Sequence, residues 1–320
     1  FEFSDIPEGC RPSLLRGFSA PVKMDTDFTD ADLAFFMAHD TDEFNRWDAA
    51  QSLLFSEIKK LVADCQNDRP LEVSSLLISA FETALTSPDT DRAFLSKMLT
   101  LPSETEIKYL YEQIDVEAIH KARVFLEQTI GSGLKPVLSD TLAACSGADP
   151  KSLSHAAMAG RSLKNLCLAY LGSIKDDAAV DLVTDHFNRA STMTEEMAAF
   201  RILAEVRPDV KKQAVNQFYD KWKKDPLVLD KWFSVQAASS TADTFESVRA
   251  LCGHSDFSMT NPNKVRALIY MFALYNPIHF HRKDGQGYGF IADRIIELDA
   301  VNPMVAARLS GCFNHWKRYD

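Results

Sequence analysis

A helical spacing of apolar residues dominates the sequence from Thr29 to its end. Apolar side chains recur at steps of three and four residues over windows of helix length, and the clearest series is Trp47, Ala50, Leu54, Ile58, Leu61 and Cys65. This spacing places one apolar stripe along a single helix. Glycine is scarce, at 12 of 320 residues, and no strand-turn-strand series recurs in this part of the chain. The sequence therefore predicts an all-α fold.

Turn and capping signals divide this region into about fifteen helices of roughly 10 to 24 residues. Ser103-x-x-Glu106 and Thr192-x-x-Glu195 are capping boxes, each of which marks a helix start. Short turns make neighbouring helices antiparallel, and a series of such hairpins forms an α-α superhelix like those of HEAT and armadillo proteins. The superhelix is expected to be irregular, because no repeat of fixed period is present. We expect residues 25–320 to form this domain, with a binding surface on its concave face.

The first 24 residues follow a different pattern. FEFSDI alternates apolar and polar residues, and SLLRGFSAPVKM is a second extended run that Gly17 and Pro21 interrupt. Both patterns are typical of β-strands. Because two strands alone do not make a stable sheet, we expect residues 1–24 to be a short β remnant, the edge of a β domain whose other strands lie outside this sequence.

Charge and hydropathy exclude two classes of partner. The formal net charge is −10 and the sequence pI is about 5.3, whereas a nucleic-acid binder needs a basic surface to neutralise phosphates. No apolar run reaches the roughly 18 to 20 residues that span a bilayer, and no leader pattern opens the chain. The sequence therefore predicts neither a nucleic-acid partner nor a membrane partner.

Six cysteines lie far apart and form no C-x-x-C pair. This distribution suits neither a zinc ribbon nor a dense disulfide framework. We interpret the cysteines as reduced core thiols, although one or two bridges remain open from sequence. The expected location is intracellular, in the cytoplasm.

Two segments begin with Asn-Pro and carry an arginine about one turn later. They are NPNKVRAL, which contains Arg266, and NPMVAARL, which contains Arg308. Asparagine is a good N-cap and proline suits the first helical position, so both segments are predicted helix starts. Arginine near a helix start would strengthen a site for carboxylate or phosphate. In the alternative interpretation, each arginine packs its stem on a neighbouring helix and pairs with an acidic side chain.

The sequence contains no recognisable catalytic motif: H-E-x-x-H, G-x-S-x-G and a Walker loop are all missing. His279 and His281 could contribute to a metal site, but no further ligand stands at a suitable spacing. Gly285 to Gly289 resembles a phosphate loop and is better explained as a turn, because it lacks the preceding strand and the lysine. The acidic cluster Asp40 to Glu43 is assigned to helix capping. We therefore predict no catalytic residue and no metal site in this chain.

Several long segments, in order, carry a resemblance to a known family. They are SLLRGFSAPVKM, AHDTDEFNRWDAAQSLL, DKWFSVQA, FSMTNPNKVRALI, DGQGYGF and NPMVAARL…WKRYD. Together they resemble the C-terminal part of bacterial-type aminopeptidase N, in the M1 family of zinc metallopeptidases. The resemblance implies that residues 1–24 end a β-sandwich and that residues 25–320 are the C-terminal helical domain. It also places zinc in a catalytic domain of the parent protein, so this chain alone should not hydrolyse peptides.

In this family the helical domain caps the catalytic cleft and lines the substrate channel. The resemblance implies that Arg266 and Arg308 approach the carboxyl-terminal side of a bound peptide, and that Met304 stands where the family often carries glutamine. The implied partners are the parent's catalytic domain and peptide substrates. Two other hypotheses remain: a free-standing α-solenoid adaptor that binds a peptide or protein in its groove, and an autonomous enzyme that uses His279 and His281.

Overall fold

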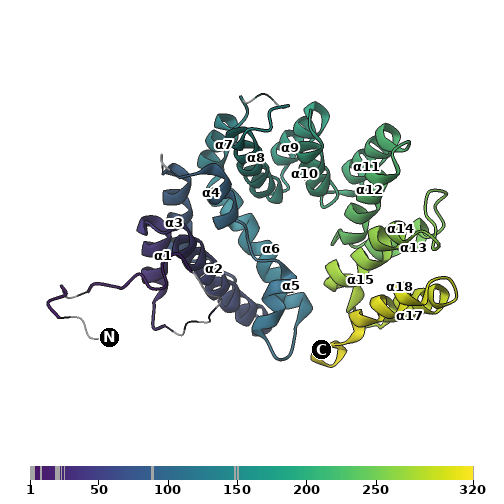
Figure 1. The fold of residues 1–320 in the computed structure, drawn as a ribbon, viewed down its shortest axis with the longest axis horizontal. Helices are drawn as coiled ribbons and strands as arrows, with labels where there is room; N and C mark the ends of the chain where they lie inside the picture. The colour runs from purple at the N-terminus through teal and green to yellow at the C-terminus, as the bar shows by residue number, and fades with distance from the viewer. Residues whose placement is uncertain are drawn as a thin grey trace. The chain divides into compact units, whose positions relative to one another are not determined.

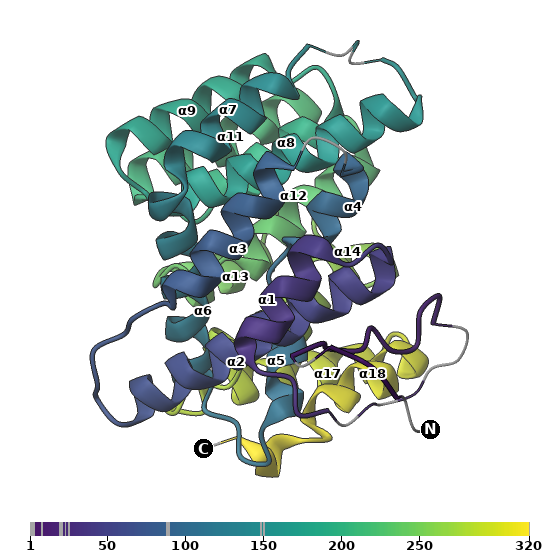
Figure 2. The ribbon, with the colours of Figure 1, turned by 90° about the vertical axis from the view of Figure 1, so that its left-hand side faces the viewer.

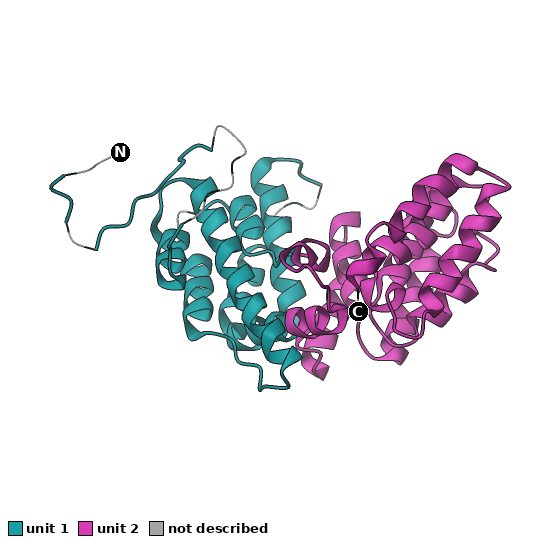
Figure 3. Cartoon of the chain, turned by 90° about the horizontal axis from the view of Figure 1, so that it is seen from below, with its two compact units in different colours: residues 1–102, 125–171 teal, residues 103–124, 172–320 magenta. Residues whose placement is uncertain are grey.

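The computed structural model describes residues 4–7, 9–18, 22, 24, 26–87, 90–147, 149 and 151–319. Helices and the turns between them make up this described part of the chain, which contains a single isolated β-bridge and no strand. The prediction of an all-α fold is confirmed. The helices fall into two compact units, residues 1–102 with 125–171 and residues 103–124 with 172–320 (Figure 3).

Unit 1 is built around its longest helix, α2 (Figure 1). The α-helices with residues in this unit are α1 (Asp30–His39), α2 (Glu43–Gln66), α3 (Ser75–Thr86), α4 (Arg92–Met98), α6 (Val116–Gly133), α7 (Lys135–Ala144) and α8 (His155–Ser173). Helix α1 lies against both α2 and α3 (Figure 2), while α4 contacts α2 and α7 contacts α3. Each of these helices thus buries one side against a neighbour.

The apolar stripe predicted on α2 lies in the core over most of its length. Ala50, Leu54, Ile58 and Leu61 are fully buried, whereas Trp47 is 36% exposed. Cys65, the last member of the series, is half-buried near the end of the helix. The helical period therefore identified the buried face of α2, and the ends of the stripe are where solvent reaches it.

Unit 2 contains the remaining helices, beginning with α5 (Glu104–Ile107), η1 (Lys108–Leu110) and the start of α6. It continues with α9 (Asp177–Arg189), α10 (Met193–Leu203), α11 (Pro208–Trp222), α12 (Pro226–Ala238), α13 (Thr244–Leu251), α14 (Pro262–Val265), η2 (Arg266–Tyr270) and α15 (Met271–Tyr275). The last elements are α16 (Pro277–Phe280), α17 (Gln286–Asp299), α18 (Pro303–Ser310), η3 (Gly311–Phe313) and η4 (Trp316–Arg318).

Helices that follow one another in the sequence pack together in unit 2. Contacts join α9 to α10, α10 to α11, α11 to α12 and α12 to α13, and α12 also packs against η2 and α15. Stacked aromatic rings fill this core, for example Phe200 on Phe218 at 4.5 Å between ring centroids. Contacts between successive helices are what the predicted series of helical hairpins requires.

The predicted helix caps form as expected. The backbone N–H and side-chain hydroxyl of Ser103 both donate to the Glu106 carboxylate, at 2.8 and 2.6 Å, and complete a capping box at α5. Thr192 accepts a hydrogen bond from the N–H of Glu195 at the start of α10. Asp42 caps α2 by accepting the N–H of Asn45 at 3.0 Å, so the acidic cluster Asp40 to Glu43 has the capping role assigned to it.

The strands predicted in residues 1–24 are not found in the described part of this segment. Phe1 to Phe3, within FEFSDI, and residues 19–21 and 23, within SLLRGFSAPVKM, lie outside the described residues. The described residues of this segment form turns and coil. This coil docks on the turn before α2, where Arg16 pairs with Asp40 at 2.8 Å and the N–H of Gly17 donates to Asp42. An extended segment becomes a strand only beside a partner strand, and the described residues provide none.

Candidate functional site

The two Asn-Pro segments begin helices, as the sequence predicted. Asn261 accepts hydrogen bonds from backbone N–H groups of α14, which begins at Pro262. Asn302 accepts the N–H of Val305 at 3.2 Å in α18, which begins at Pro303. Each asparagine accepts from N–H groups that the first helical turn leaves without a partner. Each proline stands at the first helical position, where an N–H group would have had no helical acceptor. Both helix starts belong to unit 2.

The helix that begins at Pro262 contains a π-helical turn. Residues Arg266 to Tyr270 form this turn, η2, between α14 and α15. Its inner residues Ala267, Leu268 and Ile269 are buried, so the wider turn is held in the core. π-Helical turns are rare in proteins and are frequent at functional sites. The sequence analysis did not identify this feature, because the residue pattern of a π turn does not differ from that of an ordinary buried helix.

Tyr270 joins the π turn to α18. Its hydroxyl donates a hydrogen bond to the carbonyl oxygen of Val305 at 2.9 Å. Burial raises the pKa of Tyr270, and the positive charges of Arg308 and Arg266 act in the opposite direction. Both guanidinium groups are therefore close enough to the phenol to affect its ionisation. The fold brings the two predicted arginines together around a tyrosine that sequence reasoning missed.

Neither arginine is engaged by an acidic side chain of the described residues. Arg266 and Arg308 are both exposed, and among the described residues no hydrogen bond or ion pair involves either guanidinium. By contrast, Arg249 pairs with Glu246 at 3.4 Å in the same unit. The alternative interpretation, in which each arginine pairs with a carboxylate of this chain, therefore finds no support in the described part of the structure. Two guanidinium groups without acceptors can bind an external carboxylate bidentately.

Met304 shares one side of α18 with Arg308. The two residues are four positions apart, which places them next to each other on a helix surface. Met304 is 74% exposed, so its thioether is available to an approaching molecule. The site formed by Arg266, Tyr270, Met304 and Arg308, hereafter the arginine site, thus combines two cations with one apolar side chain.

His279 and His281 have separate structural roles. The Nε2 atom of His279 lies 3.0 Å from the carbonyl oxygen of Thr241, and the Nδ1 atom of His281 lies 2.7 Å from the hydroxyl of Tyr288. The His281 ring also stacks on Tyr319, with 3.4 Å between ring centroids. Burial lowers the pKa of His279, and burial with the charge of a nearby lysine lowers the pKa of His281 to about 3.

A metal centre finds no suitable set of ligands in the described structure. Within residues 4–319, apart from the positions that are not described, no group of three or more His, Cys, Asp or Glu could hold a metal ion. The donor set therefore does not fit a zinc site, which needs three or four such ligands. His279 and His281 form hydrogen bonds and ring contacts instead.

The glycine-rich segment Gly285 to Gly289 ends a turn at Gly285 and forms the start of α17 from Gln286 onward. Gly285 has a φ of 72°, in the left-handed region, and caps the helix. A Cβ atom at Gly287 would lie 2.5 Å from the carbonyl oxygen of His279 and closer still to that of Phe280. Glycine is needed there because the α17 backbone touches the end of α16. The segment therefore serves a close approach between two helices, and the turn predicted over Gly285 to Gly289 includes only its first residue.

A known protein family matches most of this chain. The family described as "Domain of unknown function (DUF3458_C) ARM repeats" matches residues 30–320.

No helix of the described structure is both long and apolar enough to cross a membrane.

Three curated relatives are named aminopeptidase N. The protein from Escherichia coli is 39% identical over 323 residues, that from Caulobacter vibrioides is 36% identical, and that from Haemophilus influenzae is 34% identical. These alignments cover 99 to 100% of this chain and 36 to 37% of each relative. The chain therefore spans little more than a third of the length of these proteins.

A solved structure has a closely similar fold. The crystal structure of Legionella pneumophila aminopeptidase A in complex with aspartic acid aligns with a TM-score of 0.84 and 32% identity. The alignment covers 96% of this chain and 36% of that protein. These matches show that the chain belongs to the DUF3458_C family of ARM-repeat domains and corresponds to the C-terminal helical region of aminopeptidase N.

Proposed function

We propose that this chain is the C-terminal helical domain of an M1 zinc aminopeptidase and forms part of the wall around its peptide substrates. The identity of 34 to 39% to three proteins named aminopeptidase N, along the whole chain, supports the proposal. The zinc and the residues that activate water would belong to the catalytic domain of the same parent protein, which is the main partner of this chain. Residues 1–24 would form the boundary with a preceding β-sandwich.

The arginine site would contact the carboxyl-terminal side of a bound peptide. A single observation carries this assignment: Arg266 and Arg308 lie around Tyr270, and no carboxylate of the described chain neutralises them. A peptide ends in a carboxylate, and a guanidinium binds a carboxylate through two parallel hydrogen bonds. On an open surface such a contact contributes little, but in a channel from which water is excluded the same pair is stronger.

Met304 would influence which residues of the peptide are accepted. Its exposed thioether is apolar and flexible, and it lies one helical turn from Arg308. A glutamine in this place would offer donors and an acceptor of hydrogen bonds, which methionine lacks. We therefore expect Met304 to favour apolar side chains beyond the scissile bond.

A chimera tests the function and the arginine site together. This chain would replace the aligned region of E. coli aminopeptidase N, and hydrolysis would be measured for two substrates, a tripeptide with a free carboxylate and the same tripeptide as its C-terminal amide. With Arg308→Gln or Arg266→Gln, KM for the free acid should rise about tenfold, which corresponds to about 1.4 kcal/mol, while KM for the amide should change less than twofold. Met304→Gln should change the preference among tripeptides and leave the Arg308 effect intact.

Arg189→Gln is the matched control for this experiment. Arg189 is exposed on α9 and pairs with Asp185 at 2.8 Å, so its loss should affect neither substrate. If Arg308→Gln and Arg266→Gln raise KM equally for the acid and the amide, the carboxylate assignment is wrong. If the unsubstituted chimera folds but has no activity, the proposal that this chain completes an aminopeptidase is wrong.

The chain by itself should have no peptidase activity. Incubation of the purified chain with zinc and a leucine 7-amido-4-methylcoumarin substrate is expected to give no turnover, because the described residues lack a set of zinc ligands. Turnover that persists through further purification would contradict the proposal. The adaptor hypothesis instead requires that the natural protein has no catalytic domain. The complete coding sequence tests this requirement.

We also propose an intracellular location, in the cytoplasm. All six cysteines are free thiols in the structure, and Cys145 and Cys167 are buried. Thiols persist in a reducing compartment, whereas secreted proteins commonly oxidise theirs. Fractionation of cells that produce the natural protein, followed by thiol labelling, tests this location.

A further inference from the structure

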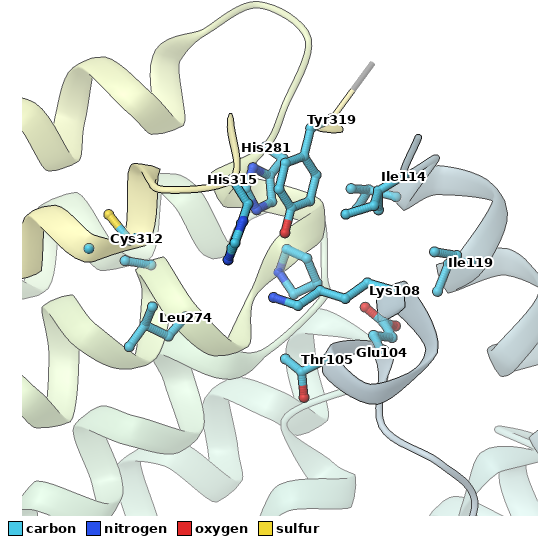
Figure 4. A pocket seen from close by; sticks show the side chains of 14 residues that line it. Glu104, Thr105, Lys108, Ile114, Ile119, Leu274, His281, Cys312, His315 and Tyr319 are labelled. Carbon is cyan, nitrogen blue, oxygen red and sulfur yellow. The ribbon is translucent and has the colours of Figure 1, made fainter. Parts of the chain in front are cut away.

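A pocket lies within unit 2, and none of its lining residues belongs to the arginine site. Its cavity volume is about 160 Å³, and 14 residues line it (Figure 4). They come from three parts of the chain, residues 104–119, 273–281 and 311–319. Because these parts are far apart in the sequence, only the tertiary fold creates this pocket, hereafter the Lys108 pocket.

The walls of the Lys108 pocket combine apolar side chains with polar ones. Ile114 and Ile119 are 2% and 3% exposed, and Leu274 lies on the opposite side (Figure 4). The C-terminal wall is fixed to the rest of unit 2, because the N–H of Ile114 donates to the carbonyl oxygen of Arg318 at 2.6 Å and Tyr319 stacks on His281. A pocket with fixed apolar walls loses little conformational entropy when a ligand enters.

Lys108 brings a charged ammonium group into this pocket. Its side chain is half-buried and extends from its helix into the middle of the pocket (Figure 4). Among the described residues, no hydrogen bond and no ion pair engages its ammonium group. Glu104, the lining carboxylate, is bound instead by His120 at 2.7 Å. A partly desolvated ammonium group without an anion is costly, and a bound anion would remove much of that cost.

The electrostatic surroundings of Lys108 also favour an anion. Burial lowers the pKa of Lys108, and the positive charge of Arg318 lowers it further. The Arg318 guanidinium is itself held by backbone carbonyl groups, including that of Glu112 at 3.2 Å, and makes no ion pair with a described side chain. Arg318 therefore adds a second positive charge near Lys108, while the lining carboxylate of Glu104 is bound by His120.

We propose that the Lys108 pocket binds a small monocarboxylate with a compact apolar body. The Lys108 ammonium would bind the carboxylate, and Ile114, Ile119 and Leu274 would surround the apolar part. The volume suits a ligand of this size, since an engineered cavity of about 150 Å³ holds one benzene molecule. The proposal does not depend on the aminopeptidase function, because it uses only residues of this pocket.

Methyl-detected NMR on the full chain provides the test. The probe is 4-methylpentanoate, whose branched chain fits the apolar walls, and its neutral control is 4-methylpentanamide. The carboxylate should shift the δ1-methyl signals of Ile114 and Ile119 in a saturable titration. The amide, which has nearly the same shape, should bind at least tenfold more weakly, because it lacks the negative charge.

Substitutions locate the binding within the pocket. Lys108→Met keeps most of the length of the side chain without its charge. It should weaken binding of the carboxylate at least tenfold and leave binding of the amide unchanged. Lys121→Met is the matched control, because Lys121 is exposed on the same unit and does not line the pocket, and it should change neither affinity. Leu274→Trp should fill the cavity and abolish binding of both compounds; Leu274 is 41% exposed, so the fold can accommodate the larger ring.

Two results would overturn the proposal. The first is no saturable shift of the Ile114 and Ile119 methyl signals with 4-methylpentanoate in the folded chain. The second is equal affinity of the carboxylate for the Lys108→Met and unsubstituted proteins. If Lys108→Met does not fold, the test is the ratio of carboxylate to amide affinity in the unsubstituted protein. A ratio near one rejects the proposal that Lys108 binds the carboxylate.

Discussion

The hydroxyl of Tyr270 donates a hydrogen bond to the carbonyl oxygen of Val305 at 2.9 Å, and this bond joins two helices that both begin with Asn-Pro. Tyr270 closes the π turn that Arg266 opens, while Val305 lies in the first turn of α18, ahead of Arg308. The contact holds the two arginine-bearing segments side by side. The arginine site therefore depends on tertiary contact between separate helices.

Tyr270→Phe should lower the free energy of unfolding by about 1 kcal/mol, the usual contribution of one hydrogen bond between neutral groups. The carbonyl of Val305 keeps its capacity for the helical hydrogen bond, so the loss should stay small. Urea unfolding followed by circular dichroism measures it. Tyr275→Phe is the control, since Tyr275 is 59% exposed and should change stability by less than about 0.5 kcal/mol. Equal effects of the two substitutions would show that the bond to Val305 contributes nothing.

Gly287→Ala should destabilise unit 2 by about 3 kcal/mol, because its Cβ atom would overlap the backbone carbonyl groups of His279 and Phe280. Backbone atoms cannot move away as a flexible side chain can. Gly289→Ala is the matched control in the same helix, where a Cβ atom meets nothing within 4 Å. It should stabilise the protein by up to about 1 kcal/mol through helix propensity. Thermal unfolding of both variants should shift in opposite directions, and shifts in the same direction would contradict the close approach of α16 and α17.

The half-buried His281 should make the protein less stable in acid. Burial and the charge of Lys108 lower its pKa to about 3, so the folded state binds fewer protons than the unfolded state between pH 6.5 and 3. Its contribution to stability is present above about pH 6.5 and is lost as the pH falls, with a slope of at most about 1.4 kcal/mol per pH unit. His281→Gln should remove this slope from urea unfolding measured between pH 6.5 and 4.5. An unchanged slope would mean that His281 titrates normally.

His120 should act in the opposite sense. Its hydrogen bond to Glu104 at 2.7 Å raises its pKa above the ordinary value, although burial opposes the shift. The stabilisation is fully present below about pH 6.5 and is lost as the pH rises through the raised pKa. His120→Gln should therefore flatten the decline of unfolding free energy on the alkaline side of pH 6.5. NMR titration of the imidazole signal checks the direction, and a pKa at or below 6.5 would contradict this prediction.

Arg318→Met should loosen the C-terminal wall of the Lys108 pocket. The guanidinium donates to the backbone carbonyl groups of Lys108, Tyr111 and Glu112, and no other described side chain replaces it there. Loss of these charge-assisted bonds should lower the free energy of unfolding by about 2 kcal/mol. Limited proteolysis should then cleave near residues 108–114 more rapidly. Arg249→Met is the control: it removes an exposed i,i+3 ion pair and should change neither the free energy of unfolding nor the cleavage rate measurably.

Local signals in the sequence identified the helix boundaries. Asn261, Asn302, Ser103 and Thr192 cap helices because a side-chain oxygen satisfies N–H groups only two or three residues away. The buried residues of α2 follow from its period for the same local reason. The described part of residues 1–24 contains no strand, because a strand depends on a partner that this segment does not contain, and the assignment of residues 1–24 to a preceding β domain stays a prediction.

The sequence by itself thus determined an all-α chain, the starts of its helices and two arginines placed one turn inside two of them. Only the tertiary structure decided that Arg266 and Arg308 share the surroundings of Tyr270, and that Lys108 faces Ile114 and Ile119 in one pocket. Capping and helical period depend on neighbours within about four residues, which the sequence displays directly. These sites depend on contacts between residues 35 to more than 200 positions apart, which the packing of whole helices decides.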